Sequence, residues 1–153
     1  MVDLERASYR DNFRSHVLRH ILPFWAKYSI DETYGGYITH LNRDGSFYDY
    51  TTKRIAMQGR MVYGFSVGCS LGSSYLEYAK QGVSFLIDKA WDKRYGGWYW
   101  ALHRTGVVKD DSKNPVAQIF MIMGLTEYYR VAHDEIALKY AIDTYEILDR
   151  LAW

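Results

Sequence analysis

One arginine lies where a charged side chain is unusual. Arg60 belongs to the segment AMQGRM at positions 56–61, inside a stretch that is apolar on most sides. A guanidinium among apolar residues needs partners, because burying an unpaired charge is costly. Two interpretations remain open, a structural ion pair with a neighbouring helix or an anchor for an oxygen-rich ligand. We favour the anchor, because a few polar groups in a pocket fix the orientation of a substrate.

Three further polar side chains, two amides and one amine, lie in or near the apolar stretches. Gln58 lies two residues before Arg60 and cannot share its helix face, so we interpret it as a structural hydrogen-bonding residue. Lys113 and Gln118 flank the start of a second apolar stretch, where each either faces solvent or lines a pocket. The predicted substrate-binding residues are therefore Arg60, Lys113 and Gln118. No catalytic residue is assigned within this chain.

The histidines and the single cysteine give no metal or nucleophile signal. His16 and His20 are spaced i, i+4, yet no Glu follows the first and no third ligand is apparent, so no metal site is predicted. His40 and His103 recur at equivalent turn positions, which favours an architectural role over a catalytic one. Cys69 has no neighbouring His and is expected to be a buried, inert thiol. No cofactor is predicted.

The chain nearly repeats itself with a period of about 60 residues. The segment DETYGGY at 31–37 returns as DKRYGGW at 92–98, and each copy lies between helix-patterned stretches and precedes a charged turn. Asp suits the first position of a tight turn, and Gly supplies the positive φ that such turns need. The end of the chain, DRLAW at 149–153, resembles DKAW at 88–91, as if a third round begins. Repetition at this length predicts stacked helical pairs that share a core.

The apolar periodicity places five helices and two hairpins. Amphipathic outer helices are expected over 3–22, where Pro23 perturbs or ends the helix, and over 74–89 and 134–151. Helices that are apolar nearly all round, and hence inner, are expected over 53–71 and 114–132. Short β-hairpins are expected over 37–48 and 98–108. The fold class is all-α in one domain, with repeat units at about 3–71 and 73–133 and a third begun at 134–153.

Composition excludes several classes of protein. The chain has 48% hydrophobic residues, 24% charged residues and a net charge of +1. Positive and negative residues are mixed along it without a long block of like charge, so no segment suits binding to a nucleic acid or an anionic membrane. No apolar run reaches the length of a membrane span, and the lone Cys69 and the charged N-terminal residues favour a cytoplasmic setting. Aromatic residues make up 17% of the chain, and each ring either lines a sugar-binding wall or fills space between helices.

Four motifs together resemble a known family. YGGY at 34–37, LNRDG at 41–45, QGR at 58–60 and DKRYGGWY at 92–99 are similar to the N-terminal part of the N-acylglucosamine 2-epimerase family. That family also includes cellobiose 2-epimerases and aldose-ketose isomerases. The match continues through Lys113-Asn114 and Gln118-x-Phe120 to EYYR at 127–130. Two pocket positions depart from it, since Ala56 and Val116 stand where many relatives have aromatic residues.

The resemblance implies a fold and a reaction. The fold is an (α/α)6 barrel, a toroid of six helical hairpins, of which this chain is the N-terminal portion. The reaction is a cofactor-free proton transfer at the carbon beside a sugar carbonyl. In the family a His pair exchanges that proton, and it lies in later repeats, beyond Trp153. Arg60 matches an arginine that holds substrate oxygens near the developing enediolate.

Three functions are weighed against one another. The first is a sugar 2-epimerase or aldose-ketose isomerase acting on a monosaccharide or disaccharide. The second is a non-catalytic carbohydrate-binding or scaffold module derived from that family. A glycoside hydrolase would need two opposed carboxylates on an inner face, and none can be picked out. Because half a toroid leaves apolar helix faces open, the chain is also expected to associate with itself or with a missing barrel half.

Overall fold

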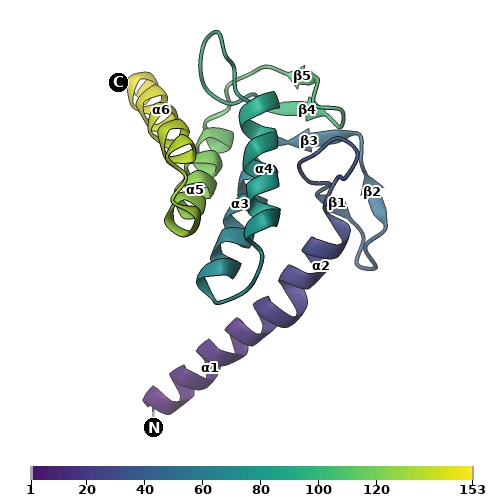
Figure 1. Cartoon of the computed structure of the whole chain (residues 1–153), viewed down its shortest axis with the longest axis vertical. Coiled ribbons are helices and arrows are strands. Elements are labelled where there is room, and N and C mark those ends of the chain that lie inside the picture. Colours follow the sequence, from purple (N-terminus) through teal and green to yellow (C-terminus); the bar gives the residue numbers. More distant parts are fainter. Residues whose placement is uncertain (1, 153) are drawn as a thin grey trace.

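The computed structural model describes residues 2–152, and the side chains of residues 8–150 within them. The described chain is mostly helical with a few short strands (Figure 1). Its elements in order are α1 (Val2–His16), the π-helical segment η1 (Val17–Ile21), α2 (Leu22–Tyr28), β1 (His40–Leu41), β2 (Phe47–Asp49), β3 (Thr52–Arg54), α3 (Ile55–Ser70), α4 (Leu76–Lys89), β4 (Ala101–His103), β5 (Val108–Asp110), α5 (Pro115–Ala132) and α6 (Glu135–Ala152). In residues 2–152 no helix has both the length and the apolar character to cross a membrane.

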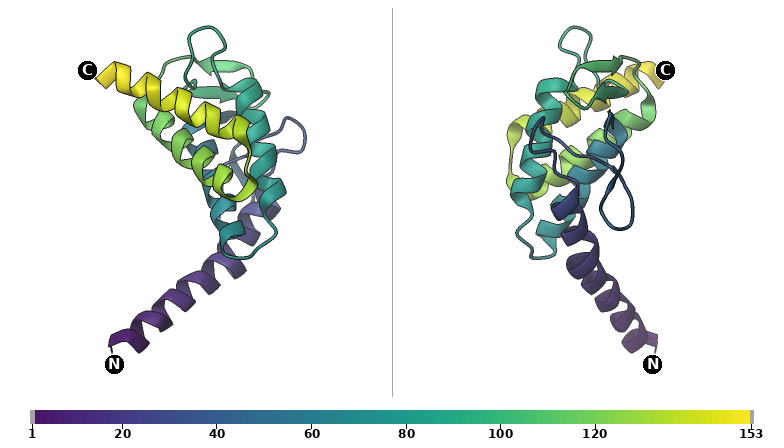
Figure 2. Two further views of the ribbon diagram at one scale, coloured as in Figure 1. Left: turned by 60° about the vertical axis from the view of Figure 1, so that its left-hand side comes forward. Right: turned by 90° about the vertical axis from the view of Figure 1, so that its right-hand side faces the viewer.

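The N-terminal helix does not end at Pro23. Helical structure continues through η1 into α2 and stops at Tyr28, so the predicted end at residue 22 is six residues short. Proline removes a hydrogen-bond donor and crowds the carbonyl four residues earlier, and the wider π-helical turn over 17–21 accommodates it. Proline therefore perturbs this helix without ending it. The first part of this helix, α1, extends away from the other helices (Figure 2), and its residues Tyr9 and Phe13 are exposed.

The two inner helices pack against each other with their backbones in close approach. A Cβ placed on Gly124 of α5 would lie 2.5 Å from the backbone oxygen of Gly59 in α3. A Cβ on Gly59 would in turn lie 2.7 Å from the backbone oxygen of Phe120. Only residues without a side chain permit this spacing. The buried core around these helices includes Ile55, Val62, Phe65, Leu86, Leu102, Met121 and Leu125.

The strands form two small antiparallel sheets. β1 pairs with β2 as a predicted hairpin, whereas β4 and β5 join β3 in a three-stranded sheet of order β3-β4-β5. The register pairs Thr52 with His103 and Arg54 with Ala101. The strand β3 leads directly into α3, so the second hairpin docks on the entry to the first inner helix. Sequence reasoning did not anticipate β3 or this joining of the two repeats.

The two Gly-Gly turns adopt the same conformation. The glycines have φ of +76° and +68° in the first turn and +73° and +76° in the second. In each turn the backbone oxygen of the Asp accepts from the first Gly N–H, at 2.7 Å for Asp31 and 2.9 Å for Asp92. Each Asp carboxylate also accepts two backbone N–H groups of its own turn. The sequence repeat is therefore a structural repeat.

Candidate functional site

Arg60 lies at the rim of an apolar pocket between the N-terminal helix and α3. The pocket has a volume of about 210 Å³, and its lining residues are Ile21, Leu22, Trp25, Met57, Arg60, Met61, Gly64 and Phe65. The guanidinium is exposed and lies over the ring of Phe120 in α5, 5.1 Å from the ring centroid. Its Nη1 donates to Met57 Sδ at 3.8 Å.

The Arg60 side chain is exposed because the face of α3 that carries it is open. Within the described residues no carboxylate lies within ion-pair distance of Arg60, so the structural ion pair considered from the sequence does not form there. A guanidinium has five N–H donors in a fixed planar fork. Most of this capacity remains available to a ligand in the adjoining pocket.

Lys113 holds the second Gly-Gly turn. Its Nζ lies 2.9 Å from Asp92 Oδ2 and 4.0 Å from the centroid of the Tyr99 ring. In the first repeat Lys53 makes the matching contact, with Nζ 2.8 Å from Asp31 Oδ2. Lys113 does not line the pocket beside Arg60. Its predicted role in substrate binding stays a prediction, while its observed contacts stabilise the turn.

Gln118 is buried and uses both ends of its amide on the backbone. Its Oε1 accepts from Trp98 N at 2.9 Å, and its Nε2 donates to Trp98 O at 2.7 Å. Gln58 clamps Tyr37 in the same way, at 2.9 and 2.8 Å. The structural role predicted for Gln58 therefore has a counterpart in Gln118. Ligand binding by Gln118 stays a prediction and would require these two hydrogen bonds to break.

The three predicted binding residues do not converge on one cavity. Arg60 borders the pocket against the N-terminal helix, and Lys113 borders a different cavity near Tyr95. Gln118 lies in the interior, at 1% exposure. Of the three, only Arg60 combines an open position with free donors. The candidate site is therefore the Arg60 pocket.

Asp31 forms an ionic cluster that sequence reasoning missed. Its buried carboxylate accepts from Lys53 Nζ at 2.8 Å and from Arg104 Nε and Nη2 at 2.9 and 3.1 Å. The Arg104 guanidinium also lies 5.4 Å from the ring centroids of both Tyr34 and Tyr50. Burial by itself raises the pKa of Asp31, but hydrogen bonds from Arg104 and Lys53 outweigh it and lower the pKa to about 2. The carboxylate is therefore ionised and enclosed, which suits a structural role.

The histidines do not line the candidate site. His16 and His20 are exposed with ring centroids 5.2 Å apart, and the described side chains, those of residues 8–150, include no group of three arranged to hold a metal. His103 is exposed on β4, and His40 lies on β1. None of the chain's five histidines, all of them among the described side chains, lines the Arg60 pocket. Cys69 is partly buried, and burial raises the pKa of its thiol, as expected for an inert cysteine.

Comparisons with known proteins agree on one family. The model of the family described as N-acylglucosamine 2-epimerase (GlcNAc 2-epimerase) matches residues 36–153. Cellobiose 2-epimerase of Dictyoglomus turgidum is 29% identical over 138 residues, which cover 89% of this chain and 35% of that protein. N-acylglucosamine 2-epimerase of Mus musculus is 27% identical over 143 residues, covering 88% of this chain and 32% of that protein.

Solved structures show the same fold. Cellobiose 2-epimerase from Bacillus thermoamylovorans superposes with a TM-score of 0.85 at 34% identity, over 94% of this chain and 37% of that chain. A D-mannose isomerase superposes with a TM-score of 0.81 at 21% identity, which supports the fold alone. The chain thus spans about a third of the length of the relatives it matches.

Proposed function

The chain belongs to the N-acylglucosamine 2-epimerase family, and on that premise we propose that it forms the N-terminal portion of an (α/α)6 barrel in a sugar 2-epimerase or aldose-ketose isomerase. Two repeats with the same turn geometry and a third outer helix, α6, support the partial barrel. The repeat units are proposed at about 3–71 and 73–133, with the third begun at 134–153. The substrate class is a monosaccharide or disaccharide with a reactive carbonyl carbon.

The observation that carries this proposal is the open Arg60 guanidinium beside an apolar pocket. Charged donors hold sugar oxygens strongly, and they stabilise the negative charge that develops when a proton leaves the carbon next to a carbonyl. Trp25 and Phe65 in the pocket wall supply aromatic faces, and Phe120 lies beneath the guanidinium. Such faces suit the C–H surfaces of a sugar ring. Together they make a subsite that orients a sugar and polarises its oxygens.

Proton transfer itself needs an acid and a base near neutral pH. Imidazole suits this task, but none of the five histidines here borders the Arg60 pocket. We therefore assign sugar binding to Arg60 and place the proton-transferring histidines in the later repeats that the family resemblance implies. No metal or cofactor enters this proposal.

Ligand-observed NMR with the purified chain tests the binding part. Cellobiose, mannose and N-acetylglucosamine are offered separately, and at least one is expected to bind. Arg60→Gln should weaken that binding by roughly 10- to 100-fold, as expected for the loss of charged hydrogen bonds. Arg54→Gln is the matched control, because Arg54 lies over Trp100 and outside the pocket. Binding that Arg60→Gln leaves unchanged would contradict the proposed anchor.

A non-catalytic carbohydrate-binding or scaffold module is the second candidate. It is favoured by the position of the histidines, none of which lines the pocket. Deuterium incorporation at C2 of the bound sugar, measured in D₂O with the longest available form of the protein, separates the two functions. Exchange at C2 supports the epimerase or isomerase. Sugar binding without exchange supports the binding module.

Open apolar side chains on the inner and outer helices support self-association. Val116 and Ile119 on α5 and Ile142 and Tyr145 on α6 are each exposed. Exposed apolar surface of this kind favours association. We expect a dimer or larger species by light scattering at micromolar concentration, and a clean monomer would contradict this part of the proposal.

A further inference from the structure

The molecule contains two copies of one surface, and only the first copy is covered. We define the Asp31 socket as Asp31, Tyr34, Lys53 and strand β3. Its counterpart in the second repeat, the Asp92 socket, comprises Asp92, Tyr95, Lys113 and residues 112–114. In both sockets the Lys reaches the Asp carboxylate, and in both the following segment leads into an inner helix. The first copy therefore shows how the second can be filled.

A β-hairpin fills the Asp31 socket. Strand β4 pairs with β3 in antiparallel register, and Arg104, which follows β4, sends its guanidinium onto Asp31 and over Tyr34. The backbone closes the same contact, since Arg104 N donates to Thr51 O at 2.9 Å and Arg104 O accepts from Lys53 Nζ at 2.8 Å. Within this socket the Asp31 side chain is 0% exposed and the Lys53 side chain 2%.

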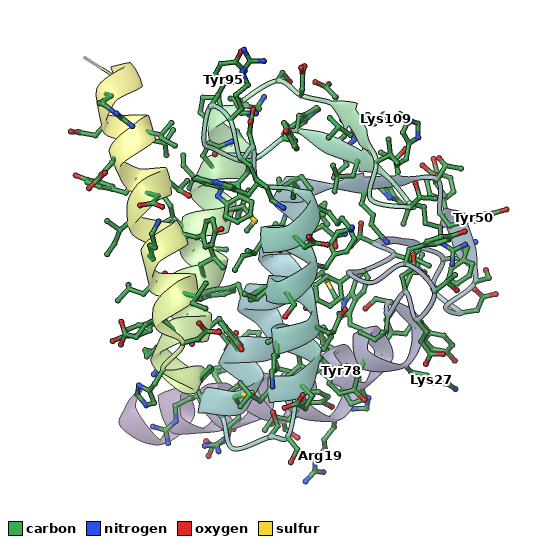
Figure 3. The ribbon with its side chains drawn as sticks, turned by 45° about the horizontal axis from the view of Figure 1, so that its top comes forward. Arg19, Lys27, Tyr50, Tyr78, Tyr95 and Lys109 are labelled. Carbon is green, nitrogen blue, oxygen red and sulfur yellow. The ribbon has the colours of Figure 1, made fainter. Side chains whose placement is uncertain are left out.

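The Asp92 socket is open by the same measures. Its Asp side chain is 10% exposed and its Lys side chain 25%. A cavity of about 340 Å³ lies beside it, lined by Tyr95, Gly96, Lys113, Ile147 and Arg150. A cavity of about 590 Å³ also lies beside the filled Asp31 socket, next to Tyr34 and Gly35, so side-chain exposure and not a cavity distinguishes the two sockets. Among the described residues no strand pairs with 112–114. Figure 3 shows Tyr95 at the edge of the molecule near the start of α5, whereas Tyr50 lies on the opposite side, near the strands.

The hydrogen bonds of the two carboxylates identify what the open socket lacks. Asp31 accepts five, two from backbone N–H groups, one from lysine and two from Arg104. Asp92 accepts three, two from backbone N–H groups and one from lysine. The difference is one bidentate arginine. Arginine is the side chain whose planar fork matches a carboxylate in this way.

We propose that the Asp92 socket binds a further β-hairpin of the type formed by residues 98–110, whose inner strand pairs with residues 112–114 and whose arginine binds Asp92. The partner is thus a β-hairpin whose inner strand has backbone groups free for pairing and which carries an arginine at the position that corresponds to Arg104. This inference rests on the structural repeat and not on the sugar-binding proposal, so either can fail alone.

Two differences between the sockets limit the match. Pro115 has no N–H, whereas Ile55 at the same place donates to Trp100 O at 3.2 Å, so the new pairing has one backbone hydrogen bond fewer. Arg150 also lines the cavity beside the Asp92 socket and is an alternative cation for Asp92. Its Nε donates to Glu146 O at 3.2 Å instead.

A peptide in trans tests the docking. A disulfide-closed peptide with the sequence of residues 98–110 is titrated into the ¹⁵N-labelled chain. We expect shifts at the amides of residues 92–97 and 111–114, and at least tenfold weaker binding when the peptide carries Arg104→Gln or the chain carries Asp92→Asn. When the peptide carries Arg104→Gln and the chain carries Asp92→Asn, binding should be little weaker than with either change alone, because both changes remove the same contact. Asp88→Asn is the matched control, an exposed aspartate outside the socket.

A fused version removes dependence on the stability of an isolated hairpin. A copy of residues 92–133 is attached after residue 153, and amide hydrogen exchange is measured at residues 112–114. Protection of these amides that disappears when the copy carries the Arg104→Gln change supports the proposal. Exchange at 112–114 that stays fast in the fusion overturns it. A rise in the pKa of Asp92 when Arg150→Gln is introduced into the unextended chain also overturns the proposal, because it would show that Arg150 already binds the Asp92 carboxylate.

Discussion

Replacing Asp31 by asparagine should destabilise the fold more than the same change at Asp92. The Asp31→Asn change keeps the shape of the side chain but leaves Lys53, 2% exposed, and Arg104 without their carboxylate. The pKa of about 2, against an ordinary 3.8, corresponds to ~2 kcal/mol of stabilisation by the ionised form. Breaking a buried ion pair by removing one partner costs about 3–5 kcal/mol. We therefore expect a loss of roughly 2–5 kcal/mol in the free energy of unfolding.

Asp92 is the control within the same molecule. Its lysine partner is 25% exposed and can turn toward water when the carboxylate is removed. The asparagine oxygen can still accept hydrogen bonds from the two backbone N–H groups of the turn, whose nitrogens lie 2.9 and 3.0 Å from Asp92 Oδ1. Burial by itself raises the pKa of Asp92, but hydrogen bonds from Lys113 and from these backbone groups lower it to about 2 as well, which corresponds to ~2 kcal/mol. Asp92→Asn should therefore cost up to about 2 kcal/mol, less than Asp31→Asn, because only Asp31→Asn also leaves a fully enclosed lysine and an arginine without their carboxylate.

Urea unfolding followed by circular dichroism measures both changes, because urea does not screen charge. The pH dependence provides a second test. The folded pKa of Asp31 lies below its unfolded value, so its stabilisation is present above about pH 4 and is lost as the pH falls from about 4 toward 2. Asp31→Asn should remove part of that acid dependence. Equal costs for the two variants, or an unchanged acid profile in Asp31→Asn, would refute the assignment of Asp31 as a buried ionic centre.

Two further predictions concern the packing of the inner helices and the turns. Gly124→Ala should destabilise by more than about 2 kcal/mol, because its Cβ would lie 2.5 Å from a backbone oxygen of α3. Gly64→Ala is its control on α3, where nothing lies within 4 Å, and should stabilise by about 0.5–1 kcal/mol in the same urea assay. Gln58→Leu leaves the N–H and C=O of Tyr37 unpaired and should cost roughly 2–4 kcal/mol, with faster hydrogen exchange at that amide. An unchanged exchange rate at Tyr37 would contradict the clamp.

Part of the helical framework follows from the sequence, most clearly at α5, because this inner helix carries its own start signals. The expected range 114–132 agrees with α5 at Pro115–Ala132, since Asn114 caps it through a 2.9 Å bond to Val116 N and proline suits its first position. The expected range 53–71 extends slightly beyond α3, because Thr52–Arg54 form a strand instead. That strand depends on β4, almost 50 residues away, which local patterns do not reveal.

The site was harder to predict than the fold. Lys113 and Gln118 match Lys53 and Gln58, which stand 60 positions earlier and make the same kinds of contact. Only an alignment of the two repeats reveals these pairs, and ligand binding by Lys113 and Gln118 stays a prediction. The contact of Arg104 with Asp31 spans 73 residues, and nothing local to either residue indicates it.

The same comparison of repeats separates folding residues from candidates for function. Asp, Lys and Gln occur at matching positions in both repeats and make matching contacts, so their types follow from the turn they hold. Arg60 breaks this pattern, because the residue 60 positions later is Phe120, and the two lie stacked on each other. A charge that the repeat does not require, that is exposed and that has no carboxylate partner in the described chain adds little to stability. Arg60→Gln should therefore change the free energy of unfolding by no more than about 0.5 kcal/mol while it weakens sugar binding. A large loss of stability from that change would place Arg60 among the folding residues instead.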